Sequence, residues 1–145
     1  MNTFFPTNFS PRTTVVGGIT IVNLTPHALD IIGLEGNART YEPSGYSIRV
    51  STSSGGQVGT IGSVHVPMFE SDILGESVLV DENHQKICSV SDIPVRDDMV
   101  LIVSGMAGSR LKDRLDVFVP MTSPSDNPVR NDKGHITAVR GIKKP

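Results

Sequence analysis

Runs of apolar residues separated by polar turns predict that most of this chain folds as short β-strands. Residues 19–32 hold two β-branched apolar runs on either side of a polar turn around Asn23 and Thr25, which is the pattern of a strand, a corner and a second strand. Pro26 fixes its own φ angle and favours an extended Thr25, so we expect a stiff corner that also holds His27 in place. This corner is the first candidate for a functional site.

A continuous apolar run at residues 99–103 predicts a central strand buried on both faces. The run leads into residues 104–111, where we expect one short helix with Ser104 as its N-cap, although two glycines weaken it. Residues 51–56 contain four Ser or Thr followed by two Gly and predict a flexible hairpin loop. Residues 68–75 are expected to form one helical turn.

These elements predict an α+β, mainly β fold: a single compact domain with an antiparallel or mixed sheet and one or two short helices. A length of 145 residues suits one domain. Residues 1–18 are polar and unpatterned, so we interpret them as an N-terminal arm or tail and residues 19–145 as the globular domain. If this N-terminal arm is ordered, Phe4, Phe5 and Phe9 have to be buried, either in the chain's own core or in a neighbouring subunit; on a free tail their burial energy is lost. We therefore expect a homo-oligomer, most simply a dimer, with the N-terminal arm in its interface.

Composition excludes several classes of function. The formal charge of −2 and pI near 6.0 give no overall attraction to nucleic acid, so we expect no direct binding to duplex nucleic acid. No stretch is long and apolar enough to span a bilayer, and residues 1–11 lack the pattern of a secretory signal. The single Cys88 allows neither an internal disulfide nor a cysteine zinc cluster. A reducing cytoplasm is the expected compartment.

The charge is unevenly distributed along the chain. Residues 30–98 contain eleven Asp and Glu against four Lys and Arg, whereas residues 110–145 contain eight Lys and Arg against four Asp. An acidic middle and a basic end can attract each other within the fold or between subunits, or can form two solvated faces.

Six short blocks follow one another along the chain. They are Asn23-Leu24-Thr25-Pro26-His27, Pro43-Ser44-Gly45, Ile48-Arg49-Val50, Ile102-Val103-Ser104, Arg114-Leu115-Asp116 and Val129-Arg130-Asn131-Asp132-Lys133-Gly134. Together they resemble a family of small proteins encoded by bacteriophages, prophages and some bacteria, over roughly residues 19–142. That family has no settled activity, so the resemblance implies the cytoplasm of a host cell but no particular reaction. The N-terminal arm and the loop around residues 123–128 look longer than the family's common pattern.

The start of the expected helix offers groups that bind anions. Ser104 and Gly105 place free backbone N–H groups and a hydroxyl beside a central strand, an arrangement that often binds phosphate or carboxylate. No phosphate-loop fingerprint is present, and Ser104 can equally serve only as a helix cap. An arginine side chain can grip phosphate through two N–H groups; the candidates are Arg110, Arg114 and Arg130. Arg114 can instead pair with Asp116, two residues along the same expected strand.

Histidine chemistry is open to several interpretations. His27 can act as a general acid or base, can orient a bound base, or can bond to nearby backbone as part of the corner. The other histidines are His65, His84 and His135. Their spacing matches no metal-binding motif, so no metal and no cofactor is expected. Ser104, His27 and Asp116 form a nominal nucleophile set without a nucleophile elbow, and a hydrolase that uses this set is not expected.

The predicted ligand-binding residues are Asn23, Thr25, His27, Ser104, Gly105, Arg110, Arg114 and Arg130. We expect them to bind a small anionic ligand of the nucleotide type, a host defence signal that a phage gains by sequestering; the choice of ligand class is an analogy. One alternative is a phosphodiesterase that cleaves such a ligand with His27 as acid or base. Another is a structural or assembly component of a phage particle.

Overall fold

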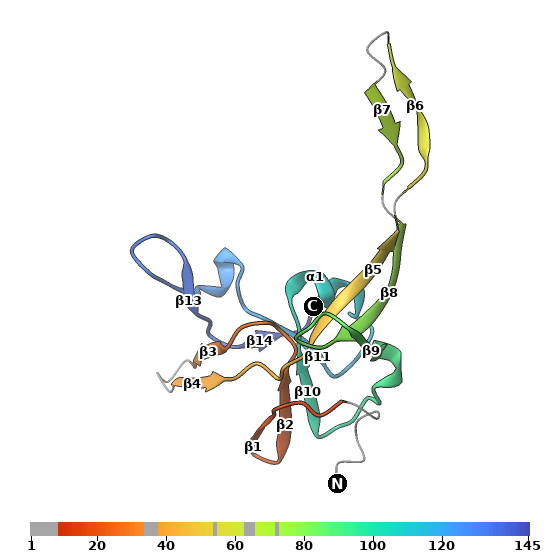
Figure 1. Ribbon diagram of the computed structural model, residues 1–145. Coiled ribbons are helices and arrows are strands. Elements are labelled where there is room, and N and C mark those ends of the chain that lie inside the picture. The colour runs from red at the N-terminus through yellow and green to blue at the C-terminus, as the bar shows by residue number, and fades with distance from the viewer. Residues whose placement is uncertain (1–8, 34–37, 54, 63–65, 72) are drawn as a thin grey trace.

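The computed structural model describes residues 9–33, 38–53, 55–62, 66–71 and 73–145. Its main sheet has five strands in the order β1-β2-β10-β11-β14 (Figure 1). These strands are β1 (Thr14–Val16), β2 (Ile19–Asn23), β10 (Met99–Ile102), β11 (Val117–Pro120) and β14 (Ile142–Lys143). The three inner strands are parallel, and β1 and β14 run antiparallel at the two edges. The predicted mainly β fold with a mixed sheet is confirmed.

Strand β10 is the central strand, as its apolar sequence predicts. The side chains of Met99, Leu101 and Ile102 are buried. Leu101 lies opposite Val22 on β2 and Val117 on β11, and all three are fully buried. Parallel strands covered on both faces are typically continuous hydrophobic runs, which explains why this stretch of sequence lacks alternation.

A short helix, α1 (Gly105–Arg110), connects β10 to β11. Ser104 is its N-cap, as predicted, because its Oγ accepts a hydrogen bond from the N–H of Ala107 at 3.3 Å. Gly108 lies so close to Val119 on β11 that a Cβ at this position would collide with Val119 Cγ1. The glycine that weakens an isolated helix therefore allows this helix to pack tightly on the sheet.

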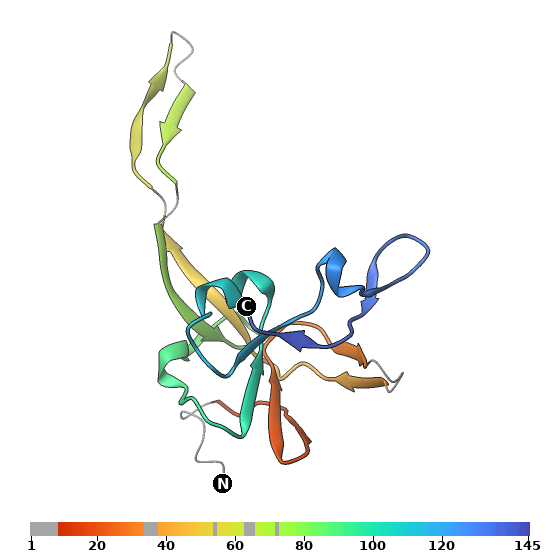
Figure 2. The ribbon, with the colours of Figure 1, turned by 180° about the vertical axis from the view of Figure 1, so that it is seen from behind.

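A second, antiparallel sheet has the order β5-β8-β9. It consists of β5 (Ser47–Ser53), β8 (Ile73–Val80) and β9 (Lys86–Ser89). Beyond it, β6 (Gln57–Ile61) and β7 (Val66–Phe69) form a two-stranded hairpin. This hairpin projects away from the body of the molecule in both views (Figures 1 and 2). We call residues 57–62 and 66–69 the hairpin arm and the rest of the described chain the body.

Smaller elements complete the body. They are β3 (Leu29–Ile32) paired with β4 (Ala38–Tyr41), β12 (Val129–Arg130) paired with β13 (Ile136–Ala138), and the 3-10 helices η1 (Val90–Asp92) and η2 (Pro124–Asp126). Val139, after β13, exchanges backbone hydrogen bonds with Asp30 and Ile32 of β3. The two small hairpins are thereby linked. In the described part of the chain, no helix has the length and apolar character needed to cross a membrane.

The described part of the N-terminal segment belongs to the body. Phe9 is 3% exposed and contacts Tyr46 edge to face, with ring centroids 4.8 Å apart. Strand β1 adds to the main sheet through β2. Phe9 is thus buried in the chain's own core, whereas Phe4 and Phe5 lie outside the described residues.

Two local predictions are wrong. Residues 51–53 continue strand β5 instead of beginning a loop, because Thr52 and Ser53 pair with Leu74 and Ile73 of β8. The helical turn predicted for residues 68–75 is also wrong, since this segment holds the end of β7 and the start of β8. In both places pairing with a neighbouring strand decides the backbone conformation, and local composition does not.

Candidate functional site

The Asn-Leu-Thr-Pro-His corner between β2 and β3 is organised by the side chain of Asn23, which is 1% exposed. Its Oδ1 accepts hydrogen bonds from the N–H of Thr25 at 3.0 Å and from the Thr25 hydroxyl at 2.6 Å. Its Nδ2 donates to the carbonyl oxygens of His27 at 2.9 Å and Tyr41 at 3.0 Å. All hydrogen-bonding groups of this amide are thus used within the fold. Asn23 thus connects the backbone of the corner to itself and to Tyr41.

A cleft of about 830 Å³ opens beside this corner. Its walls come from five places in the sequence: the corner, the turn at residues 43–46, strand β5, the turn between β8 and β9, and helix α1 with its N-cap. Leu24, Tyr46, Ile48 and Ala107 contribute apolar surface. The polar and charged lining includes Thr25, Arg49, Asp81, Glu82, His84, Ser104 and Arg110. A cleft of this size that combines apolar walls with a few polar groups is typical of sites for small ligands.

Two arginines of the cleft are not paired with carboxylates among the described residues. Nη2 of Arg49 lies 3.4 Å from Nδ1 of His84, and Nη2 of Arg110 donates to the carbonyl oxygen of Gly75 at 2.8 Å. Arg49 and Arg110 are both exposed. Their remaining N–H groups can therefore bind an anion without first breaking an ion pair in the described structure.

The two acidic residues of the cleft are engaged by the protein. Oδ1 of Asp81 accepts hydrogen bonds from the backbone N–H groups of Asn83 at 2.8 Å and Gln85 at 3.0 Å. Glu82 forms an ion pair with Arg12 at 3.0 Å. Asp81 thus shapes the turn that presents His84. The φ angle of His84 is 63°, in the left-handed region, which is uncommon for a residue other than glycine. The charge of Glu82 is offset by Arg12.

The start of helix α1 supplies one wall of the cleft. Ser104 is exposed and lines it, while its Oγ caps the helix. Gly105, the next residue, is exposed and does not line the cleft, and a Cβ there would meet open space. The imidazole of His27 likewise belongs to an exposed residue outside the lining, although its carbonyl oxygen helps to fix the corner.

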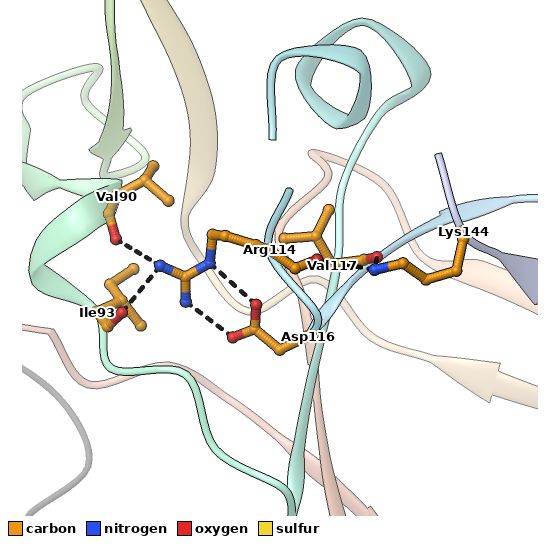
Figure 3. A network of polar contacts seen from close by, with 6 residues as sticks. All are labelled: Val90, Ile93, Arg114, Asp116, Val117 and Lys144. Carbon is orange, nitrogen blue, oxygen red and sulfur yellow. Dashed lines mark hydrogen bonds and ion pairs between the residues drawn. The ribbon is translucent and has the colours of Figure 1, made fainter. Parts of the chain in front are cut away.

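Arg114 does not line the cleft; it belongs to a network of polar contacts within the body (Figure 3). Its Nε and Nη2 bind the two carboxylate oxygens of Asp116 at 2.9 and 2.8 Å. Its Nη1 donates to the carbonyl oxygens of Val90 at 3.1 Å and Ile93 at 2.9 Å. The side chains of Arg114 and Asp116 are 14% and 1% exposed. This bidentate pair joins the start of β11 to η1, in agreement with the ion-pair interpretation of Arg114.

Arg130 also lies outside the cleft. It belongs to β12, in the separate hairpin with β13 (Figure 1), and its Nη1 donates to the carbonyl oxygen of Gly134 at 2.8 Å. Among the predicted residues, the structure thus brings Thr25, Ser104 and Arg110 into one cleft. Asn23 does not line the cleft, but its hydrogen bonds hold the corner that does.

Sequence reasoning missed Arg49, His84 and Tyr46 as residues of this cleft. Arg49 and His84 are 35 positions apart and meet because β5 pairs with β8, with Arg49 opposite Val78. Strand alternation indicates that Arg49 lies on the face opposite Tyr46 and Ile48, but it does not show that residues of both faces reach the same cleft. For His84, the only local signal was its place in a polar turn.

In the described part of the chain, no group of three or more His, Cys, Asp or Glu residues could hold a metal ion. Cys88 is half-buried, and its burial, with a smaller contribution from the nearby Asp92 carboxylate, raises the pKa of the thiol. A thiol with a raised pKa is a poor nucleophile. Comparisons of the chain with protein-family models, curated proteins and solved structures find no match.

Proposed function

We propose that this protein binds a small anionic ligand of the nucleotide type in the cleft beside the Asn-Leu-Thr-Pro-His corner. The observation that carries the proposal is the presence of Arg49 and Arg110 on the same cleft, free of carboxylate partners among the described residues, beside apolar surface from Tyr46 and Ile48. Arginines suit phosphate, and apolar and aromatic surface suits a nucleobase. A volume of about 830 Å³ is sufficient for such a ligand.

Binding alone is favoured over cleavage. A phosphodiesterase that uses His27 needs the imidazole within reach of the bound phosphate, and the structure offers no support for this, because His27 does not line the cleft. His84 does line it. Its Nδ1 lies next to Arg49, however, and no described carboxylate binds the imidazole to orient it as a catalytic base. The resemblance to phage proteins extends the proposal to a biological role: sequestration of a nucleotide signal of host defence in the host cytoplasm.

Isothermal titration calorimetry with a panel of linear and cyclic nucleotides tests the proposal. We expect heat for at least one nucleotide and none for the matching uncharged nucleoside, because the phosphate provides the contacts to the arginines. Chromatography of the ligand after incubation distinguishes binding from cleavage: recovery of intact nucleotide is the expected result, and a hydrolysed product would favour the phosphodiesterase. No heat with any nucleotide would rule out the proposal.

The biological role has its own test. Expression of the protein in a host that uses a nucleotide signal against phages should restore plaque formation by a sensitive phage. An Arg49→Ala, Arg110→Ala double variant at equal abundance should not restore it. Equal protection by both proteins would contradict sequestration through this cleft.

A further inference from the structure

The hairpin arm consists of two described strands and exposes several apolar side chains to solvent. Val58, Val66 and Phe69 are 58%, 50% and 62% exposed. Among the described strands, β6 pairs only with β7. A two-stranded hairpin is marginally stable by itself in water, whereas three or more strands with a hydrophobic face are stable. The arm therefore has the properties of a surface that is completed by another polypeptide.

The arm has one edge that is suited to pairing. Strand β6 pairs with β7 on one side and has no described partner strand on the other. The same holds for β5, the strand before it in the chain, which pairs only with β8 among the described strands. The opposite strand, β7, contains Pro67. Proline has no backbone N–H and is normally restricted to unpaired edges. A further strand is thus expected to add to β6.

The absence of charge on the arm indicates which kind of partner strand can add to β6. Residues 57–69 contain no Asp, Glu, Lys or Arg, and no Lys or Arg occurs anywhere between residues 50 and 85. A surface without basic residues lacks the contacts that nucleic acid backbones require. Most exposed edge strands carry charges, often lysine, that prevent them from pairing with copies of themselves. This edge carries no charge, and its register shift between Gln57 and Gly59 lies near its start. Two identical uncharged arms can therefore approach each other through the rest of β6 without repulsion.

We infer that the hairpin arm is a self-association element in which β6 of one copy pairs antiparallel with β6 of a second copy. A two-fold axis places the same strand of each copy against the other and gives a closed, isologous contact. The product is a four-stranded ribbon in the order β7-β6-β6-β7. This interface is distinct from the ligand cleft and from the N-terminal arm, so it stands or fails independently of the proposed function.

Sedimentation analysis of the full chain over a range of concentrations tests this inference. We expect a species of twice the 15.6 kDa chain mass. Val58→Lys places a charge on β6 and should raise the dissociation constant of the dimer at least about tenfold. Val95→Lys makes the same change at a valine of the body that is 52% exposed, and it should leave the dimer unchanged. A wild-type chain that is monomeric at every concentration, or a dimer equally sensitive to both variants or to neither, would overturn the inference.

Crosslinking locates the contact directly and does not depend on the effect of a charge. In a Cys88→Ser background, a single cysteine placed in turn at each of residues 57–61 should give a disulfide-linked dimer on mild oxidation at the position nearest the two-fold axis, because there the two paired strands bring a residue opposite its own copy, about 5 Å away. Val95→Cys is the matched control and should remain monomeric on a denaturing gel. Crosslinking at residue 95 alone, or at none of these positions, would place the interface elsewhere and contradict the pairing of β6.

Discussion

The body of the molecule and its hairpin arm are both built from β-strands, but different interactions hold them together. In the body, the parallel strands β2, β10 and β11 bury their apolar residues, and buried polar groups such as Asn23 and Asp116 are fully hydrogen-bonded. In the arm, β6 and β7 pair only with each other among the described strands and leave Val58 and Phe69 exposed.

This difference leads us to expect different effects of substitutions in the two regions. A buried, satisfied polar group is costly to disturb because its partner remains buried without compensation. An exposed apolar residue on an extended hairpin contributes little within one chain and gains energy only when another surface covers it. Substitutions in the body should therefore affect unfolding, and substitutions in the arm should affect association.

The largest loss of stability is expected for Asp116→Ala. It leaves the Arg114 guanidinium, 14% exposed, without its carboxylate, and removal of one partner of a buried ion pair typically costs about 3–5 kcal/mol. Urea unfolding measures the change. Asp113→Ala, an exposed position on the same connection, is the control and should stay within about 0.5 kcal/mol of wild type. Equal effects of the two substitutions would show that the pair does not hold η1 to β11.

A somewhat smaller loss is expected for Asn23→Ala. The substitution removes the acceptor for the Thr25 N–H and the donor to two carbonyl oxygens, which should cost about 2–4 kcal/mol in the free energy of unfolding. The exposed Asn83→Ala provides the comparison and should change the free energy by less than about 0.5 kcal/mol. Nucleotide binding should weaken with Asn23→Ala, measured where the variant remains folded, because the corner forms one wall of the cleft. Unchanged stability and binding would remove Asn23 from its organising role.

Asp126 provides a prediction about acid sensitivity in the body. Hydrogen bonds from Lys143, with a smaller contribution from Ser123, lower the pKa of the Asp126 carboxyl below its usual range. The group is easier to protonate in the unfolded chain, so its stabilising effect is present above about pH 4 and is lost as pH falls through the lowered folded pKa. In Lys143→Met, unfolding measured between pH 3 and pH 7 should show a smaller loss of stability on acidification. The same pH dependence in both proteins would contradict this assignment.

The smallest effect on stability is expected in the arm. Phe69→Ser, at a side chain that is 62% exposed, should change the unfolding free energy of dilute protein by no more than about 0.5 kcal/mol. Dilution matters because unfolding of a dimer depends on concentration. A loss above about 2 kcal/mol in the monomer would mean that the arm packs on the body and that the contrast between the two regions is wrong.

The parts of the fold that were predictable are those that local sequence determines. The unbroken apolar run of β10 indicates burial on both faces, Ser104 has the chemistry of an N-cap, and Pro26 marks a corner. The end of β5 was not predictable in this way. The composition of residues 51–56, four Ser or Thr followed by two Gly, is that of a loop. Only pairing with β8 extends the strand through Ser53.

The candidate site was harder to predict, because it depends on contacts between distant residues. Arg110 and Arg114 are four positions apart and equally suited to bind anions, yet Arg110 reaches the cleft and Arg114 is held by Asp116. Nothing in their immediate sequence separates them except the nearby Asp116. Arg49 and His84 meet through the pairing of β5 with β8, which no periodicity specifies.

Calorimetry on arginine variants tests most directly whether Arg49 and Arg110 bind the phosphate of a nucleotide in the cleft. With the best-binding nucleotide of the panel, Arg49→Ala and Arg110→Ala should each weaken binding at least about tenfold, because each loses a charge-assisted hydrogen bond. Arg39→Ala removes an exposed arginine from β4, outside the cleft, and should change the affinity less than about twofold. Wild-type affinity in both cleft variants, or an equal loss in Arg39→Ala, would contradict phosphate binding by Arg49 and Arg110.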